Sequence, residues 1–443
     1  MLWTRPDPPG RLRLGYCTNL HPATTFAELL EGLRTVSVPL RRRVAPEDRF
    51  GVGLWLAAPL AAELAAPSGS ERLAELAAFL EREGLTPYTF NAFPYGDFHR
   101  AGLKRDVFRP SWAEEERLAY TLDVARVARR LCPARVSHVA ISTHTGGFGA
   151  DFSEPEARRA AARNLARCAL ALARHEEEGG PRLVLALEAE PRSLANDVAA
   201  LAAWFDELLP IGLETLAPRL DLAREDAERL LRRHLGWCVD ACHAAVEFEA
   251  AEDVVAAVRA SGFAFGKLQH SSALRLERPG DQPRAVEALL AMDEPRYLHQ
   301  VTALDAAGTS RLGVLDLPEL AALLERGGDE AAAWRAAREW RCHFHVPVDR
   351  AQLDAAGLSA TRDDAERLLA RFGADPAPPG AAELHVEIET YTWDVLSVAA
   401  RGPGDLVELL EREVDRVALV LRRAGWRPAL DPAPATRNPP SPR

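Results

Sequence analysis

Short apolar runs alternate with amphipathic segments along most of the chain. The runs have the length of buried strands, and they are Leu14–Thr18, Phe50–Leu56, Tyr88–Ala92, Val136–Ser142, Leu183–Glu188, Trp237–Asp240, Phe263–Gln269 and His385–Tyr391. Helical spacing of apolar residues is found between most of them, in Phe26–Arg34, Ser70–Glu83, Glu114–Leu131, Glu156–Glu177 and Ala251–Ala260. Alternation of this kind indicates parallel strands joined by helical crossovers, and it predicts an α/β fold, a (β/α)8 TIM barrel.

The segment before the last predicted strand has more strand signals than an eight-stranded barrel needs. Tyr297–Ala303 and Ser310–Leu315 flank a turn-like sequence at Asp305–Gly308, and this arrangement predicts a β-hairpin. We therefore expect an insertion over residues 280–350, above one rim of the barrel. The run Cys342–Val348 is either part of this insertion or a barrel strand.

These patterns also set the expected boundaries. Residues 1–12 are predicted to be an N-terminal extension, residues 13–425 the barrel with its insertion, and residues 426–443 a disordered tail, because this tail is rich in proline. Ser153 and Glu156 have the spacing of a capping box at the start of a helix.

Composition narrows the class of protein. The chain has 443 residues, of which 47% are hydrophobic and 27% charged, and a formal net charge of −11. This acidity disfavours nucleic acid as a partner, and the longest apolar runs are too short to predict a membrane span. The six cysteines lack close pairs, so we expect buried, reduced thiols and a cytoplasmic location; they are residues 17, 132, 168, 238, 242 and 342.

Acidic residues and a histidine stand where predicted strands end. Glu188 ends one strand, Asp240 ends the next with His243 three residues later, and Glu389 lies in the last. Because a parallel barrel gathers these ends at one rim, the side chains are expected to converge. Carboxylate and imidazole groups suit Mn, Zn or Mg, so the sequence predicts a divalent metal site. The alternative for each acid is an ordinary solvated or ion-paired residue of the rim.

Three further polar residues are candidates for binding a small-molecule substrate at the same rim. Asn91 begins an aromatic-rich loop after a predicted strand, and His21 follows the first one. Both are predicted to face the pocket, with packing of their loops as the alternative. His345, with His343 two residues before it, either lines the pocket or packs inside the insertion.

Several motifs together resemble a known group of proteins. They are Leu14–Pro22, Phe90–His99, Gly266–Gln269, His343–Pro347 and Glu387–Trp393. With these motifs the chain resembles the xylose-isomerase-like barrel superfamily of sugar-phosphate isomerases and epimerases, and within it the EboE family of metabolite-traffic proteins from the bacterial ebo cluster.

The resemblance implies roles for individual residues. In the ketose epimerases of that superfamily a Glu, an Asp, a His and a Glu hold the metal, and the two glutamates also transfer the proton. Glu188, Asp240 and Glu389 match three of these ligands, while Gln269 stands where the histidine would be. His243 matches a histidine that contacts the substrate.

Three functions therefore remain open. The first is a role in metabolite traffic, in the processing or export of a secondary-metabolite precursor alongside other ebo-cluster proteins, with a metal-dependent isomerase-like pocket. The second is a metal-dependent sugar phosphate isomerase or epimerase of primary metabolism. The third is a barrel that binds a small molecule without catalysis, which the unusual Gln269 would favour.

Overall fold

Eight parallel strands close into a barrel in the computed structural model, which describes residues 1–217, 223–354, 356–374 and 380–431. Each strand pairs with the next along the chain, and β14 pairs with both β8 and β2 to close the ring. The barrel strands are β2 (Pro9–Cys17), β3 (Phe50–Trp55), β4 (Leu85–Asn91), β5 (Val139–His144), β6 (Leu183–Glu188), β7 (Leu235–Asp240), β8 (Ala264–His270) and β14 (Leu384–Ile388). The predicted (β/α)8 barrel is confirmed.

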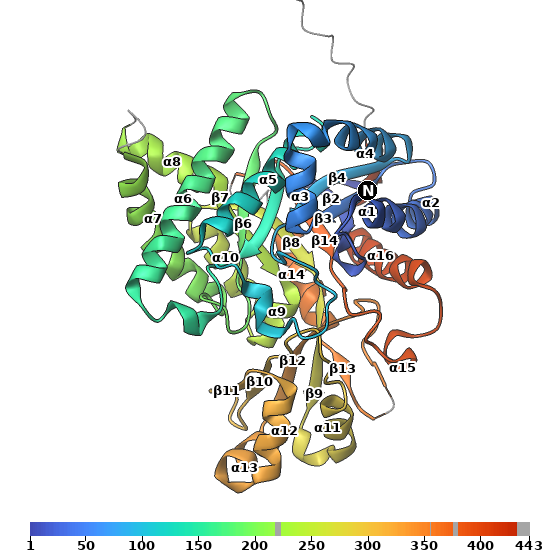
Figure 1. Ribbon diagram of the computed structural model, residues 1–443. Helices are drawn as coiled ribbons and strands as arrows, with labels where there is room; N and C mark the ends of the chain where they lie inside the picture. The colour runs from blue at the N-terminus through green and yellow to red at the C-terminus, as the bar shows by residue number, and fades with distance from the viewer. Residues whose placement is uncertain (218–222, 355, 375–379, 432–443) are drawn as a thin grey trace, which may run out of the picture.

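Helices surround the barrel and supply the crossovers between its strands (Figure 1). They are α1 (Phe26–Gly32), α2 (Val38–Val44), α3 (Ala58–Ala65), α4 (Ser70–Arg82), α5 (Glu115–Leu131), α6 (Pro155–Glu177), α7 (Val198–Leu216), α8 (Arg224–His234), α9 (Ala241–Val246), α10 (Ala251–Ala260), α14 (Arg362–Ala374), α15 (Val398–Arg401) and α16 (Leu406–Arg423). A π-helical turn, Leu33–Ser37, joins α1 to α2. Short 3-10 turns are Thr18–Leu20, Pro67–Gly69, Lys104–Phe108, Gly149–Phe152 and Pro279–Asp281.

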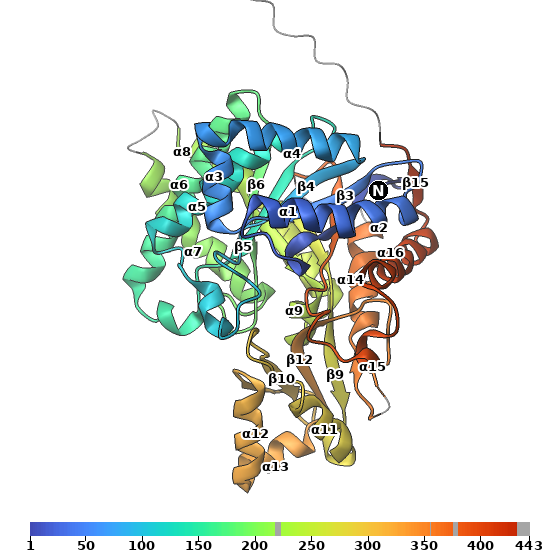
Figure 2. The same ribbon diagram turned by 45° about the vertical axis from the view of Figure 1, so that its right-hand side comes forward.

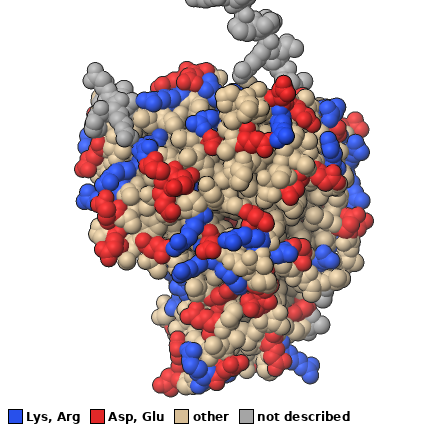
Figure 3. Space-filling view, viewed as in Figure 1, with Lys and Arg blue, Asp and Glu red and all other residues tan. Residues whose placement is uncertain are grey.

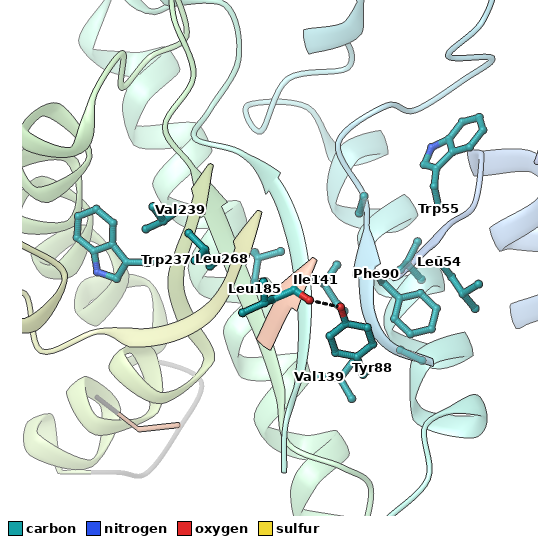
Figure 4. Packing of buried hydrophobic residues seen from close by; sticks show 14 of the residues in the cluster. Leu54, Trp55, Tyr88, Phe90, Val139, Ile141, Leu185, Trp237, Val239 and Leu268 are labelled. Atoms are coloured by element: carbon teal, nitrogen blue, oxygen red, sulfur yellow. Dashed lines mark hydrogen bonds between the residues drawn. The ribbon is translucent and has the colours of Figure 1, made fainter. Parts of the chain in front are cut away.

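The barrel wall and the helices around it share one hydrophobic core. Figure 4 shows part of this core, in which side chains from neighbouring strands, such as Val139, Ile141 and Leu185, pack together. The Tyr88 hydroxyl is also buried there and donates to the Val386 carbonyl oxygen at 2.6 Å. Burial of this apolar surface is the main source of the barrel's stability.

Two short strands extend the barrel sheet at its first strand. β1 (Leu2–Pro6) pairs antiparallel with β2 and also with β15 (Arg427–Ala429). Residues 1–12, predicted as an extension, thus include one strand and the start of another. The tail predicted as disordered from residue 426 includes β15, and its residues 432–443 lie outside the described residues.

The insertion before the last barrel strand is a small unit with a sheet of its own. Figures 1 and 2 show it projecting from one end of the barrel. Its five-stranded sheet has the order β11-β10-β12-β9-β13. Its elements are β9 (Ser272–Glu277), α11 (Pro283–Leu290), β10 (Val301–Leu304), β11 (Arg311–Val314), α12 (Leu317–Arg326), α13 (Gly328–Ala336), β12 (Glu339–Val346) and β13 (Ser359–Ala360).

The predicted hairpin is present as β10 and β11, which pair directly. The unit is nevertheless wider than residues 280–350, since it begins at Ser272 and its sheet ends at Ala360. It also has its own hydrophobic cluster, which includes Trp334 and Trp340. The run near Cys342 belongs to this sheet and not to the barrel.

The way the insertion joins the barrel positions the site. Only Ser271 separates barrel strand β8 from β9, so one extended segment leaves the barrel and enters the insertion. β12 pairs antiparallel with β9 and runs back until Val346 lies beside Ser272. Its last residues therefore reach the rim where the carboxyl ends of the barrel strands meet.

Two other expectations are tested by the structure. All six cysteines are free and buried, as predicted. No described helix combines the length and the apolar composition that crossing a bilayer requires.

Candidate metal centre

Three carboxylates from three barrel strands converge at this rim. Glu188 ends β6, Asp240 ends β7, and Glu389 directly follows β14. Each is at most 3% exposed, and one oxygen of each lies within 4.8 Å of the others. The predicted convergence of Glu188, Asp240 and Glu389 thus appears in the geometry.

Burial makes this group of acids electrostatically costly. It raises the pKa of Glu188 well above its usual value, and the nearby Glu389 and Asp240 charges raise it further. The pKa of Glu389 is raised for the same reasons, burial first and then Asp240. One buried cation lies below them: the Lys267 ammonium group donates to Glu387, which also accepts from Thr89 at 3.0 Å. Lys267 is thus already paired with Glu387. A further cation among Glu188, Asp240 and Glu389 would offset the repulsion between these carboxylates.

Asp240 is the best-held member of the group. Its Oδ1 atom accepts from the His243 backbone N–H at 3.0 Å and from the Ser271 hydroxyl at 2.8 Å. Although burial opposes it, the neighbouring imidazoles of His243 and His345 together with these hydrogen bonds hold the pKa of Asp240 below its usual value. The second oxygen, Oδ2, is buried without a hydrogen-bond partner among the described residues. An unpartnered buried carboxylate oxygen is what a divalent cation would fill, so the residues present fit a metal ion.

Gln269 does not take the place predicted for it as a metal ligand. Its side-chain nitrogen donates to Glu389, and its oxygen accepts from the Cys238 thiol. The side-chain oxygen of Gln269, the atom that could bind an ion, is therefore already engaged by the Cys238 thiol. Gln269 instead holds Glu389 in position, together with Asn19, whose amide donates to Glu389 at 2.8 Å.

Three histidines lie beside the carboxylates. His243 comes from α9, directly after β7, whereas His343 and His345 come from β12 of the insertion. Burial lowers the pKa of all three, that of His243 to about 4. Each therefore favours its neutral form, the form that binds metals. His343 and His345 both line the cavity. Of the two predicted alternatives, lining the pocket or packing inside the insertion, the structure therefore shows the first.

A cavity opens next to these groups, between the barrel rim and the insertion. Its polar lining includes Asn91, Glu188, Glu190 and Glu389, and its apolar wall includes a cluster of Phe98, Tyr297 and Tyr391. The three rings lie 5.0 Å apart, centroid to centroid, in each pair. Aromatic side chains with a few polar groups directed at one cavity are the usual lining of a small-molecule site.

His21, predicted to bind substrate, lies elsewhere. Its Nε2 atom is 3.4 Å from the Tyr16 hydroxyl, and its ring packs on Gly32 of α1, where no methyl group would fit. The helix covers the side chain, so His21 is not part of the described cavity lining. Asn91, by contrast, lines the cavity as predicted, and its amide lies 3.4 Å from Glu389.

Sequence reasoning assigned no role to several residues that shape the site. Lys267 is the main one, although a signal was available: it stands two residues before Gln269 on one strand, so both face inward. Lys104 and Arg296 also line the cavity, and both are paired with acids on the surface. Figure 3 shows basic side chains gathered near the place where the insertion leaves the barrel, with acidic ones around them.

Comparison with known proteins gives fold-level likenesses. No model of a known protein family matches the chain, and no curated protein matches it either. L-ribulose 3-epimerase aligns over 93% of this chain and 95% of its own at 12% identity, with a TM-score of 0.44.

Two further solved structures are similar in the same way. The IolI protein with a binding zinc atom aligns over 93% of this chain and 99% of its own at 10% identity, with a TM-score of 0.43. A protein of Anabaena variabilis described as a sugar phosphate isomerase or epimerase aligns over 94% and 99% at 12% identity, with a TM-score of 0.43. With identities and scores this low, these likenesses carry no argument about chemistry, and the resemblance to the EboE family stays a prediction.

Proposed function

We propose that this protein is a divalent-metal-dependent isomerase or epimerase of a sugar or a similar polyhydroxylated compound. The observation that carries the proposal is the convergence of Glu188, Asp240 and Glu389, three buried carboxylates within 4.8 Å of one another beside a cavity. The match of these residues to the ligand order of ketose epimerases supports the same function.

The three carboxylates would hold the ion, with Asp240 offering its unpartnered Oδ2 atom. When bound, a divalent ion polarises a carbonyl group and its neighbouring hydroxyl, which lowers the cost of removing the adjacent proton. Mn, Zn and Mg all accept oxygen ligands. The sequence-based choice among them stays open.

Glu188 and Glu389 are proposed to move the proton. Both line the cavity and come from different strands, so they reach a bound substrate from two directions. One carboxylate would take the proton from carbon and the other would return it, as general base and general acid. Asn91 and the imidazoles of His243 and His345 complete the polar wall and are proposed to contact substrate oxygens.

The physiological setting is a separate question. A role in metabolite traffic with other ebo-cluster proteins rests on the sequence motifs alone, and it is compatible with the same chemistry. Neighbouring genes would distinguish that role from primary metabolism.

The proposal is tested by turnover. Ketoses, aldoses and their phosphates would be incubated in deuterated water with the protein and Mn, Zn or Mg, and NMR would detect new isomers and exchanged carbon-bound hydrogens. Glu389→Gln keeps the side chain's size but removes both the base and one carboxylate ligand of the ion, so it should lower the rate roughly 10²-fold or more.

Glu75→Gln on the exposed face of α4 is the matched control and should leave the rate unchanged. No turnover with any compound, combined with retained sugar binding, would instead identify a non-catalytic binding barrel.

A further inference from the structure

The Nε2 atom of His243 faces the Nε2 atoms of two other imidazoles, those of His343 and His345. The His243 Nε2 atom lies 3.0 Å from Nε2 of His343 and 3.4 Å from Nε2 of His345. All three side chains are at most 6% exposed. Ring nitrogens of a barrel helix and of the insertion therefore approach each other closely inside the protein, and this close approach needs a physical explanation.

The opposite nitrogen of each ring shows where the proton is. Nδ1 of His243 lies 3.1 Å from the Ala189 carbonyl oxygen, and Nδ1 of His345 lies 2.9 Å from the Glu389 carbonyl oxygen. A carbonyl oxygen can only accept, so each Nδ1 must be the donor.

His343 follows the same rule through a side-chain amide. Its Nδ1 atom lies 2.7 Å from Oε1 of Gln300. The Gln300 amide nitrogen donates to the Pro191 carbonyl oxygen at 2.9 Å, which fixes the orientation of the amide. Oε1 is therefore an acceptor, and Nδ1 of His343 is the donor.

A neutral imidazole has one N–H, and in all three rings it is used at Nδ1. The Nε2 lone pair of His243 thus faces those of His343 and His345, across 3.0 and 3.4 Å, with no proton between them. Buried lone pairs that face each other repel, and a cation among them removes the repulsion. Outer hydrogen bonds from Nδ1 to carbonyl oxygens are also how metal-binding histidines are usually oriented.

We propose that these three Nε2 atoms form a second metal site, which binds a first-row transition-metal ion such as Zn²⁺. Zinc–nitrogen bonds of about 2.0–2.1 Å in tetrahedral geometry place ligand atoms about 3.3 Å apart. The separations of the His243 Nε2 atom from the other two, 3.0 and 3.4 Å, agree with that value. Three nitrogen ligands favour Zn over Mg, which prefers oxygen.

Further ligand atoms lie around the three imidazoles. Glu190 is within 4.8 Å of the His243 and His343 nitrogens, Cys242 of those of His343 and His345, and Asp240 of those of His243 and His345. Glu190 also lines the cavity, so it stands where the site is open to a substrate.

This site is distinct from the one in the proposed function. Asp240 belongs to both groups, since it also lies within 4.8 Å of Glu188 and Glu389. Its carboxylate thus lies between two ions, one held by carboxylates and one by imidazoles. The second site reassigns His243 and His345 from direct substrate contact to metal binding, and it stands even if the protein is not an isomerase.

The test is metal content measured ion by ion. Chelator-treated wild-type protein would be dialysed against Zn²⁺ and analysed for bound zinc, and zinc-edge X-ray absorption would identify the ligands. We expect two zinc ions per chain and clear imidazole scattering. His343→Ala should lose one equivalent and most of that scattering, while Glu389→Gln should lose the other equivalent and keep the scattering.

His175→Ala, on the outer helix α6, is the matched control and should keep both ions. Because a buried variant can misfold, Co²⁺ absorption spectra of the wild-type protein provide a readout that needs no substitution. A wild-type spectrum without nitrogen ligands, or full zinc content in His343→Ala, would overturn the second site. A single equivalent that both variants lose would also overturn it, in favour of one mixed site. Absence of turnover with normal imidazole-bound zinc would contradict only the proposed function.

Discussion

Single buried side chains control how the protein responds to pH, and Glu413 on α16 is the clearest case away from the metal centre. Its carboxylate accepts from the Thr390 hydroxyl at 2.7 Å and from the Val348 N–H at 3.0 Å, but burial still raises its pKa from 4.5 to about 8. Between these values the folded protein binds more protons than the unfolded chain. The contribution of protonated Glu413 to the free energy of unfolding is therefore fully present below about pH 4.5 and is lost as the pH rises through about 8.

Glu413→Gln should remove this dependence. The variant is expected to be more stable than wild type at pH 8, by on the order of 4 kcal/mol at most, and similar to it near pH 4.5. Urea unfolding at the two pH values measures the difference, with exposed Glu75→Gln as the control. Equal urea midpoints for wild type and variant at pH 8 would contradict the prediction.

Gly53 leaves room for the buried ion pair below the metal centre. A methyl group at Gly53 would overlap the Glu387 carboxylate, which Lys267 and Thr89 hold in place. Gly53→Ala should displace that carboxylate and leave the Lys267 charge buried without its partner, at a cost of roughly 3–5 kcal/mol.

Thermal or urea unfolding measures the cost of Gly53→Ala. Gly96→Ala is the matched control, because nothing lies within 4 Å of its added methyl group. If both variants unfold alike, the close contact at Gly53 does not control stability.

The residues of the site could be predicted only in part. Glu188, Asp240 and Glu389 were accessible to sequence reasoning because each ends or follows a barrel strand, and strand ends meet by rule. Gln269 was placed correctly on its strand, but its hydrogen bonds to Cys238 and Glu389 depend on side-chain packing, which spacing does not encode. The prediction that His21 faces the pocket is wrong for a similar reason, since helix α1 covers its side chain.

At the scale of elements, the helix starts show which capping signals matter. Thr25 and Glu28 form a complete capping box at the start of α1. The box predicted from Ser153 and Glu156 is absent, because α6 begins one residue later, with Glu154 at the cap and Pro155 in the first turn. Thr25→Ala should therefore destabilise the protein by about 1 kcal/mol, whereas Ser153→Ala should have little effect. Thermal unfolding of the two alanine variants compares them directly, and an equal loss would refute the distinction.

The strands differ in whether the local sequence or pairing with a distant strand determines them. β6 has the predicted bounds, Leu183–Glu188, because an apolar run between clear breaks determines it locally. β1 was missed, since it is short, contains Pro6 and exists by pairing with β2 and β15. The sequence does not decide whether β12 belongs to the barrel or to the insertion, because its partner β9 lies more than sixty residues earlier and no local pattern specifies such a pairing.

At the scale of the whole molecule, the barrel and the insertion have separate hydrophobic cores. We expect them to open as separate cooperative units in hydrogen exchange. Leu320→Ala in α12 removes a buried side chain of the insertion core, at a typical cost of about 2–5 kcal/mol. Amide exchange should accelerate in β10 to β12 and stay unchanged in the barrel strands. Leu185→Ala in β6 should do the reverse, and uniform acceleration in either variant would show a single unit.

The direct continuation of β8 into β9 joins the insertion to the barrel at Ser271. Its hydroxyl is bound to Asp240, so the point at which the chain leaves the barrel is fastened to a ligand candidate. A rigid rotation of the insertion about this point would carry His343 and His345 away from Asp240, while Glu188 would stay with the barrel wall. The imidazole ligands and the carboxylate ligands thus come from two different parts of the fold, so an ion bound by both kinds of ligand would fasten the insertion to the barrel.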